Sequence, residues 1–474
     1  MATEQMLQFV GREQAYPAKR AAGDRADDFA EIAARYAVPD AAEQSSRCSQ
    51  CGVPYCTVHC PLHNHIPDWL RLTAEGRLRE AYELSNATST MPEICGRICP
   101  QDRLCEGNCV IEFSGHGAVT IGSVEKFITD KAWEEGWVEP VAVGRPRGQS
   151  VGIIGAGPAG LTAAEYLRNH GYEVHVYDRH DRAGGLLTYG IPGFKLEKPV
   201  VMRRVDRLRE GGIVFHHGFA VGTDATLDQL RQRHDAVLIA TGVYRARRID
   251  VPGAEGAVRA LDYLTASNRK GFGDAVPAYD DGSLCAQGKH VVVIGGGDTA
   301  MDCVRTAVRQ GAASVKCLYR RDRVNMPGSQ REVANAEEEG VEFVWLAAPV
   351  EVAAGEVRLH RMRLGPPDAS GRRAPEPDAG GDTSIRADLV IEALGFDAED
   401  LPTLFDAPEL SVTRWGTVLV DGKTMSTSLD GVFAAGDIVR GASLVVWAIR
   451  DGRDVAASMH KYLRAVAAER KVAA

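Results

Sequence analysis

The chain has 474 residues and a formal net charge of -9, from 55 Lys and Arg against 64 Asp and Glu. This acidic balance, without a basic run interleaved with aromatics, disfavours nucleic acid as a partner. No apolar stretch approaches the roughly 18 residues of a membrane span, and the N-terminal segment lacks the apolar core of a secretory signal, so we expect a cytoplasmic protein that crosses no membrane. At roughly 150 residues per domain, the length predicts about three domains.

Cysteines are distributed unevenly along the chain. Eight of the eleven lie between Cys48 and Cys109, beginning with the spacing C-x2-C-x4-C-x3-C-P. In a reducing compartment this density indicates soft metal centres rather than disulfides. Cys48, Cys51 and Cys56 can hold one iron–sulfur cluster from a single loop, whereas a cysteine followed by proline, here Cys60, often ligates a second cluster. Zinc is the competing interpretation of four-cysteine loops.

Helical patterns separated by the cysteine loops fill residues 1 to about 145, with no convincing alternating strand. The stretch EPVAVGRPRGQS then leads into a short apolar run, so a domain boundary is expected near residue 146. The cysteines should therefore lie in a mainly helical domain of their own.

A first nucleotide-binding turn follows this boundary. The segment SVGIIGAGPAG passes from an apolar strand into the helix LTAAEYLRNHG, with Gly155, Gly157 and Gly160 in the pattern G-x-G-x-x-G. The first glycine permits the turn, the second lets backbone N–H groups approach a diphosphate, and the third lets the helix pack on the strand. Asp178 ends the next strand, where a carboxylate can accept the ribose hydroxyls of an adenosine. The alternative is a purely structural glycine-rich turn.

A second turn of this kind differs in its details. Gly295 and Gly297 open the segment GGGDTA, and the strand that should end in an acid ends in Arg320 and Arg321 instead. Guanidinium groups bind a 2'-phosphate that a carboxylate would repel, so this site is expected to bind NADPH. The alternative is that these arginines belong to a solvated strand end. At the start of the following helix, Asp298 and Thr299 either cap the helix or contact the diphosphate.

Two nucleotide sites in one chain imply a tightly held FAD and an exchangeable NADPH, between which a hydride passes by positioning alone, without a catalytic acid or base. Disulfide reductases of related layout carry a redox-active cysteine pair just after the first nucleotide unit, but the segment DRAGGLLTYGIPGFKL has none. Electrons are therefore expected to leave through the cysteine-rich domain, which favours iron–sulfur clusters over redox-inert zinc. Besides the glycines of the first turn and Asp178, the expected FAD contacts are Pro158, Ala159, Gly185, Leu186, Thr241, Gly242, Gly436 and Asp437.

The predicted fold class is α/β, with three domains. We expect a helical iron–sulfur domain over residues 1–145, an FAD-binding domain over 146–287 and 399–474, and an NADPH-binding domain over 288–398 inserted into it. Both nucleotide domains should be doubly wound and Rossmann-like, nested as in glutathione reductase. The turn-rich segment 365–382 is expected to form a mobile hairpin tip.

Beyond these separate motifs, the whole chain resembles the small (beta) subunit family of NADPH-dependent glutamate synthases, and its layout also matches the N-terminal part of dihydropyrimidine dehydrogenase. The resemblance rests on the eight-cysteine pattern and on the segments GGLLTYGIPGFKL, VVVIGGGDTAMDC, YRRDRVNMPGS and GVFAAGDIVRGASLVVWAIRDGRDVA.

The resemblance implies two [4Fe-4S] clusters with crossed ligand sets. One would be held by Cys48, Cys51, Cys56 and Cys109. The other would be held by Cys60, Cys99, Cys105 and Glu125, where Glu125 matches a glutamine ligand of the related dehydrogenase and Cys95 is the alternative fourth ligand.

The resemblance also implies a function. NADPH would reduce FAD in this chain, and the clusters would relay single electrons to FMN in a separate large subunit that makes L-glutamate from L-glutamine and 2-oxoglutarate. Two alternatives remain, a stand-alone NADPH oxidoreductase that serves ferredoxin or another acceptor, and a non-catalytic assembly module with vestigial cofactor sites.

Overall fold

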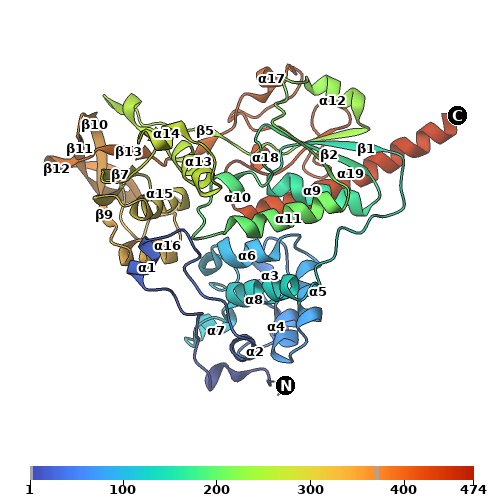
Figure 1. The fold of residues 1–474 in the computed structure, drawn as a ribbon, viewed down its shortest axis with the longest axis horizontal. Coiled ribbons are helices and arrows are strands. Elements are labelled where there is room, and N and C mark those ends of the chain that lie inside the picture. The colour runs from blue at the N-terminus through green and yellow to red at the C-terminus, as the bar shows by residue number, and fades with distance from the viewer. Residues whose placement is uncertain (1–3, 369–372, 474) are drawn as a thin grey trace.

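The computed structural model describes residues 4–368 and 373–473. In Figure 1 the N-terminal helices lie below two α/β units that stand side by side, and the C-terminal helix projects from the right-hand unit. This is the predicted arrangement of a helical part followed by two nested parallel-sheet units. None of the helices in the described ranges is both long and apolar enough to cross a membrane.

Short helices and loops build the N-terminal part. They are η1 (Gln8–Val10), α1 (Ala22–Ala26), α2 (Val38–Ser46), α3 (Tyr55–Val58), α4 (Ile66–Ala74), α5 (Leu78–Asn86), α6 (Pro92–Ile98), η2 (Gln101–Arg103), α7 (Val110–Phe113) and α8 (Ile121–Glu134). Helices α6 and α8 approach closely at Gly96, where an added Cβ would lie 2.7 Å from the backbone nitrogen of Lys126. This small residue therefore lets the helix that carries Cys95 lie directly against the helix that carries Glu125.

The first parallel sheet combines segments from both sides of the insertion. Its strands are β1 (Ser150–Ile154), β2 (Glu173–Asp178), β3 (Val214–His217), β4 (Ala236–Ile239) and, from the C-terminal region, β15 (Val432–Ala434), in the order β15-β4-β1-β2-β3. Strand β4, which lies between β15 and β1, is buried along its whole length, as expected for a parallel strand covered on both faces. The helices of this unit are α9 (Pro158–Asn169), α10 (Leu186–Tyr189), α11 (Lys198–Glu210), α12 (Leu227–Arg233), α17 (Leu401–Leu404), α18 (Asp437–Arg440) and α19 (Val445–Ala473).

The second parallel sheet has the order β6-β13-β7-β8-β9. Its strands are β6 (Val258–Arg259), β7 (His290–Ile294), β8 (Ser314–Tyr319), β9 (Glu342–Trp345) and β13 (Leu389–Glu392), and its helical segments are η3 (Ala254–Gly256), α13 (Ala260–Gly271), α14 (Pro277–Asp280), α15 (Asp298–Arg309) and α16 (Gln330–Glu338). Strand β6 pairs with β13, and α13 packs against α15. Residues 258–271 therefore belong to the second unit. The expected boundary at 287/288 lies too late in the chain for these two elements.

Two smaller sheets complete the second unit. Strands β5 (Arg245–Ala246) and β14 (Phe396–Asp397) pair antiparallel where the chain enters and leaves this unit. Strands β10 (Ala347–Ala353), β11 (Glu356–Pro367) and β12 (Arg373–Arg386) form an antiparallel sheet at its outer side (Figure 1). The predicted hairpin is confirmed, but most of segment 365–382 is strand rather than tip. Residues 369–372, part of that segment, lie outside the described residues.

One hydrophobic core joins the helical part to the first unit. Met91 and Ile94, at the start of α6, belong to the same buried cluster as Val446 and Ile449 of α19. Helix α19 also lies along α9, and an added Cβ at Gly452 would lie 2.3 Å from the carbonyl oxygen of Ala159. The helical part is therefore packed onto the face of the first unit where α19 begins.

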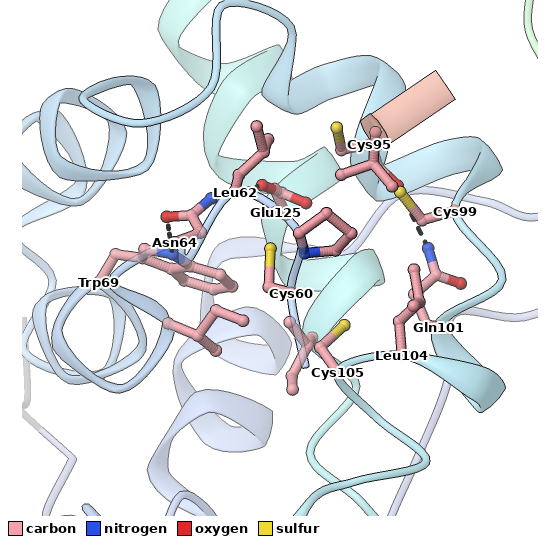
Figure 2. A pocket seen from close by; sticks show the side chains of 14 residues that line it. Cys60, Leu62, Asn64, Trp69, Cys95, Cys99, Gln101, Leu104, Cys105 and Glu125 are labelled. Atoms are coloured by element: carbon pink, nitrogen blue, oxygen red, sulfur yellow. Dashed lines mark hydrogen bonds between the residues drawn. The ribbon is translucent and has the colours of Figure 1, made fainter. Parts of the chain in front are cut away.

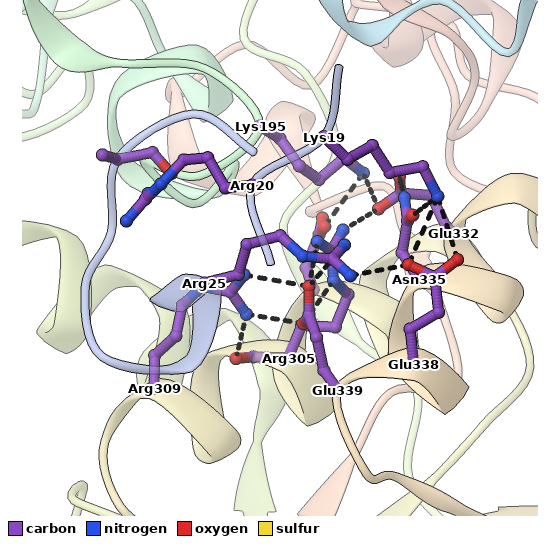
Figure 3. Close-up of polar contacts among 12 residues, drawn as sticks. Lys19, Arg20, Arg25, Lys195, Arg305, Arg309, Glu332, Asn335, Glu338 and Glu339 are labelled. Carbon is purple, nitrogen blue, oxygen red and sulfur yellow. Dashed lines mark hydrogen bonds and ion pairs between the residues drawn. The ribbon is translucent and has the colours of Figure 1, made fainter. Parts of the chain in front are cut away.

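A network of charged side chains joins all three parts (Figure 3). From the N-terminal arm, Lys19 and Arg25 bind Glu338 at 3.0 and 2.6 Å, and Arg25 also lies 3.4 Å from the buried Glu339. From the first unit, Lys195 binds Asp302 of α15 at 2.9 Å. The partners of these cations lie in α15, in α16 or directly after α16. The ion pairs therefore hold the second unit at a place other than the β5–β14 pair, where the chain enters and leaves it. We call these ion pairs the three-part network.

Candidate functional site

A pocket with about 650 Å³ of empty space opens at the carboxyl edge of the first sheet. Of the twelve predicted FAD contacts only Gly160 does not line it. The eleven that do are Gly155, Gly157, Pro158, Ala159, Asp178, Gly185, Leu186, Thr241, Gly242, Gly436 and Asp437. The sequence prediction therefore brought together residues from five separate segments of the chain.

Glycine is needed at each of the three positions of the first turn for a different structural reason. Gly155 has φ +107° and its added Cβ would lie 2.4 Å from the carbonyl oxygen of Ala240. At Gly160 an added Cβ would lie 2.0 Å from the carbonyl oxygen of Gly155, so this glycine allows α9 to pack on the turn. At Gly157 the position of a Cβ is open space on the pocket wall. That opening fits the close approach of a diphosphate to the backbone.

The two carboxylates of the pocket are held differently. Asp178 accepts backbone N–H groups from Ala156 at 2.7 Å and His180 at 2.8 Å, which leaves lone pairs on both oxygens for ribose hydroxyls. Burial, with a smaller contribution from the nearby charge of Asp451, raises the pKa of Asp437 to about 7. Asp437 is therefore a group whose charge depends on what fills the pocket.

Sequence reasoning missed several pocket residues: Ala240, Val243, Tyr244, Ser443, Leu444, Val445 and Ala448. Tyr244 is the most informative of them. Its ring lies under the Arg179 guanidinium at 4.6 Å, and within the described residues no side chain or backbone group forms a hydrogen bond with its hydroxyl. Tyr244 is half-buried and lines the pocket, so its unpartnered hydroxyl is available to a ligand there. A single tyrosine in a loop gives no spacing signal by which it could have been found.

The second turn repeats the geometry of the first. Gly295 has an added Cβ 2.3 Å from the carbonyl oxygen of Ala393, whereas Gly297 faces open space. Helix α15 begins without a side-chain cap. The Asp298 carboxylate instead accepts the backbone N–H of Ser329 at 2.9 Å and pairs with Arg103 at 3.4 Å. Of the two alternatives for Asp298, capping is therefore wrong.

Three further residues are predicted to bind the nucleotide at the second turn: Thr299, Arg320 and Arg321. Thr299 is half-buried at the start of α15. The Arg321 Nε donates to the Tyr319 hydroxyl at 3.1 Å. Arg320 is exposed, and among the described residues its side chain has no hydrogen-bond or ion-pair partner. Arg320 is therefore the arginine free to bind a phosphate.

Four cysteines form the first thiol set. Cys48, Cys56 and Cys109 are buried and Cys51 is partly exposed. Burial is the main cause that raises the pKa of Cys48 to about 11 and that of Cys56 to about 12, and the charges of the neighbouring thiols contribute to both values. The Cys48 sulfur accepts the side-chain N–H of Gln50 at 3.3 Å. Thiols whose ionisation is disfavoured in this way suit a metal centre that supplies compensating positive charge.

The second thiol set lines a cavity with about 410 Å³ of empty space (Figure 2). Burial, with smaller contributions from the charges of Glu125 and Cys95, raises the pKa of Cys60 to about 11. Burial also raises the pKa of Glu125 well above its usual range. In Figure 2 the Glu125 carboxylate lies between the Cys60 and Cys95 sulfurs, on the wall opposite Cys105. The cavity thus contains Cys60, Cys95, Cys99, Cys105 and Glu125, and both candidates for the fourth ligand remain.

In the described parts of the chain, no three His, Cys, Asp or Glu side chains lie close enough together to hold a single metal ion. The fit of the two thiol sets to iron–sulfur clusters therefore rests on their soft donor atoms, their grouping and their burial. Across the same residues, which include all eleven cysteines, each cysteine is free of a disulfide.

Comparison with known families agrees with this geometry. Residues 25–137 match the family "Dihydropyrimidine dehydrogenase domain II, 4Fe-4S cluster", and residues 149–452 match the pyridine nucleotide-disulphide oxidoreductase family. Among solved structures, FprA of Mycobacterium tuberculosis in complex with NADPH has a TM-score of 0.56 at 20% identity, covering 69% of this chain and 86% of that one. This likeness concerns the fold. Together the fold, the pocket and the thiol sets define an NADPH-dependent flavin and iron–sulfur oxidoreductase.

Comparison with two relatives indicates the family within this class of oxidoreductases. The "Glutamate synthase [NADPH] small chain" of Azospirillum brasilense is 66% identical over 473 residues, 98% of either chain. The "Putative oxidoreductase AegA" of Escherichia coli is 44% identical over 94% of this chain and 69% of its own length. The chain belongs to the glutamate synthase [NADPH] small chain family.

Proposed function

We propose that this chain is the electron-input subunit of a glutamate synthase. It oxidises NADPH and delivers electrons singly to a larger partner subunit, which carries FMN and makes L-glutamate from L-glutamine and 2-oxoglutarate. When bound, FAD converts a two-electron hydride into single electrons and two [4Fe-4S] clusters pass them on. The proposal includes the predicted cytoplasmic location.

The observation that carries this proposal is the thin wall between the two cavities. Val445 lines the flavin-type pocket, and the next residue, Val446, lines the cavity of the second thiol set. Adjacent residues at the start of α19 thus separate a nucleotide pocket from a set of metal-binding thiols. This turn of apolar helix thus contacts both sites between which an electron would pass.

For the flavin, the pocket supports the predicted contacts. Gly157 would leave room for the diphosphate, Asp178 would accept ribose hydroxyls, and Asp437 would contact the ribityl and phosphate region. We add Tyr244 to the predicted set, because its hydroxyl faces the same pocket. These groups bind and orient the cofactor, and none of them is asked to move a proton during hydride transfer.

For the nicotinamide nucleotide, Gly295, Gly297 and Thr299 form the diphosphate turn at the start of α15. Arg320 provides the contact with the 2'-phosphate, and Arg321 lies beside it. The carboxylate of Asp298 is held by its own partners and is therefore kept from repelling the diphosphate.

For the clusters, we keep the crossed assignment. Cys48, Cys51, Cys56 and Cys109 form the ligand set of the first cluster, and Cys60, Cys99, Cys105 and Glu125 form that of the second, with Cys95 as the alternative to Glu125. The mutual electrostatic influence of Cys48, Cys51, Cys56 and Cys109 supports the first group. The shared cavity supports the second.

The first thiol set marks the exit for electrons. Apolar side chains on the loops and helices that carry these cysteines are exposed: Val53 (65%), Tyr55 (49%), Val58 (51%) and Phe113 (72%). Exposed apolar groups gathered around a redox centre suit a protein partner. We therefore propose that these exposed apolar side chains bind the larger subunit.

The test is reconstitution with a larger chain that carries FMN. The chain purified without oxygen should reduce artificial acceptors with NADPH, and glutamate should form from glutamine and 2-oxoglutarate only when both chains are mixed. Full NADPH-dependent activity toward ferredoxin, without any stable larger partner, would contradict the proposal.

That outcome would favour the second candidate function, a stand-alone NADPH oxidoreductase. One comparison supports keeping it, because a relative named only as an oxidoreductase matches 94% of this chain at 44% identity. The two candidates share every cofactor site and differ only in the acceptor.

A further inference from the structure

A buried carboxylate lies directly beside the second thiol set. Glu106 follows Cys105 in the chain, and its side chain is only 2% exposed. One of its oxygens accepts the backbone N–H of Gly122, on α8, at 2.9 Å. The other accepts the hydroxyl of Tyr16 at 2.8 Å and a guanidinium N–H of Arg331. All of these donors suit an ionised carboxylate.

The cation in this arrangement comes from the other end of the chain. Arg331 lies on α16 of the second unit, and besides Glu106 it binds the Tyr16 hydroxyl at 2.6 Å. Its second terminal nitrogen lies 3.5 Å from the side-chain oxygen of Gln101. Gln101 itself lines the cavity of the second thiol set (Figure 2). One side chain of the nucleotide unit thus holds both flanks of the loop that carries Cys105.

Charge close to a redox centre alters how readily that centre accepts an electron. A negative group disfavours the reduced, more negative state, and a positive group favours it, most strongly where water is excluded. The other buried carboxylate near this cavity, Glu93, is already paired with Arg204 at 2.7 Å. Glu125 is a candidate ligand. Among the described residues, Glu106 is therefore the buried carboxylate directly beside Cys105, and Arg331 is its counterion.

We propose that Arg331, acting through Glu106, is a positioning residue that raises the reduction potential of the second cluster. The inference rests on the proposed ligand set Cys60, Cys99, Cys105 and Glu125. The step concerned is the arrival of one electron at this cluster, with no bond formed or broken and no proton taken up. The nucleotide unit thereby contributes to the energetics of electron transfer at a site that it does not contain.

The test is a redox titration of the anaerobically purified full chain, followed by electron paramagnetic resonance so that the two clusters are read separately. Arg331→Met and Arg331→Gln should both shift the second cluster to a more negative potential and leave the first unchanged. Arg331→Lys should stay close to the wild-type value. Glu106→Gln should shift the second cluster to a more positive potential, and the double variant Glu106→Gln with Arg331→Met should return toward wild type.

Arg358→Met is the matched control, because Arg358 forms an exposed pair with Glu351 on the outer hairpin. It should change neither potential. An unchanged second potential in Arg331→Gln, or loss of the second cluster in both neutral variants at position 331, overturns the inference and leaves the proposed function standing. A wild-type chain with only one cluster signal overturns the proposed ligand set itself.

Discussion

Gly157 and Gly160 lie three residues apart in one turn, yet substitution at each should fail for a different reason. In Gly157→Ala the methyl group enters the pocket, so the chain should fold normally and lose most of its FAD. In Gly160→Ala the methyl group meets the carbonyl oxygen of Gly155, which should destabilise the flavin-free chain by about 3 kcal/mol. Flavin absorbance per chain and thermal unfolding of the flavin-free proteins separate the two outcomes. Equal losses of stability would contradict the assignment.

Arg320 should decide between NADPH and NADH. It is exposed and free of partners among the described residues, whereas Arg321 is held by Tyr319. Loss of one charge-assisted contact with the 2'-phosphate should raise the KM for NADPH about 10- to 100-fold in Arg320→Ala, with little change for NADH. Steady-state kinetics with both nucleotides measure this, and Arg358→Ala serves as the control. A similar loss with both nucleotides would place Arg320 elsewhere in the mechanism.

Asp437 should make the stability of the flavin-free chain depend on pH. Its folded-state pKa of about 7 lies above the ordinary 3.8, so the folded chain holds the proton more tightly than the unfolded chain. The contribution of this group to stability is therefore fully present below about pH 4 and is lost as pH rises to about 7. Urea unfolding should show Asp437→Asn to be more stable than wild type by about 4 kcal/mol at pH 8, and equal at pH 4. An equal difference at both pH values would contradict this.

At the scale of elements, the contact between α6 and α8 determines whether the second thiol set can assemble. Gly96 lets the two helices touch, and the methyl group of Gly96→Ala would lie within 3 Å of α8 backbone. The helices should separate and move Cys99 away from Glu125. We expect iron to fall from about eight to about four atoms per chain, with FAD retained.

Iron analysis and flavin absorbance check this expectation. Gly52→Ala, in the loop of the first thiol set, is the matched control because a Cβ there meets nothing within 4 Å. It should keep both clusters. Loss of iron in the control but not in Gly96→Ala would reverse the assignment of the two sets.

Elements with a short, regular signal could be predicted from sequence, and long-range contacts could not. The glycine turns and Asp178 follow from spacing within one strand–helix–strand unit, and the structure places them as expected. By contrast, the pairing of β6 with β13 joins segments about 130 residues apart, and nothing in a two-residue strand reveals its partner. Tyr244 and Arg331 likewise acquire their surroundings only when distant segments meet. The prediction of a hairpin tip over residues 365–382 was wrong for most of that segment, because proline and glycine, which usually indicate turns, are tolerated in an edge hairpin.

At the scale of the whole molecule, the three-part network connects the N-terminal helical part and the two α/β units. Arg25 is almost fully buried, and its removal leaves Glu338 and Glu339 with fewer partners. Arg25→Met should cost about 3 kcal/mol and split a single calorimetric unfolding transition into two. Arg20→Met is the control on the same arm, since the partners of Arg20 among the described residues lie on that arm, chiefly Asp28. A single transition in Arg25→Met would show that Arg25 is not needed to couple the units.

The same network sets an order of events during synthesis. Arg25 leaves the ribosome 313 residues before its partner Glu338, an interval of roughly 15 to 60 s at ordinary elongation rates. Helices form in about a microsecond, so the cysteine-bearing segments are complete long before the N-terminal arm can dock. The N-terminal arm is thus translated long before its final neighbours exist, and the nascent chain passes through a stage in which its metal-binding part is folded but not yet docked on the second unit.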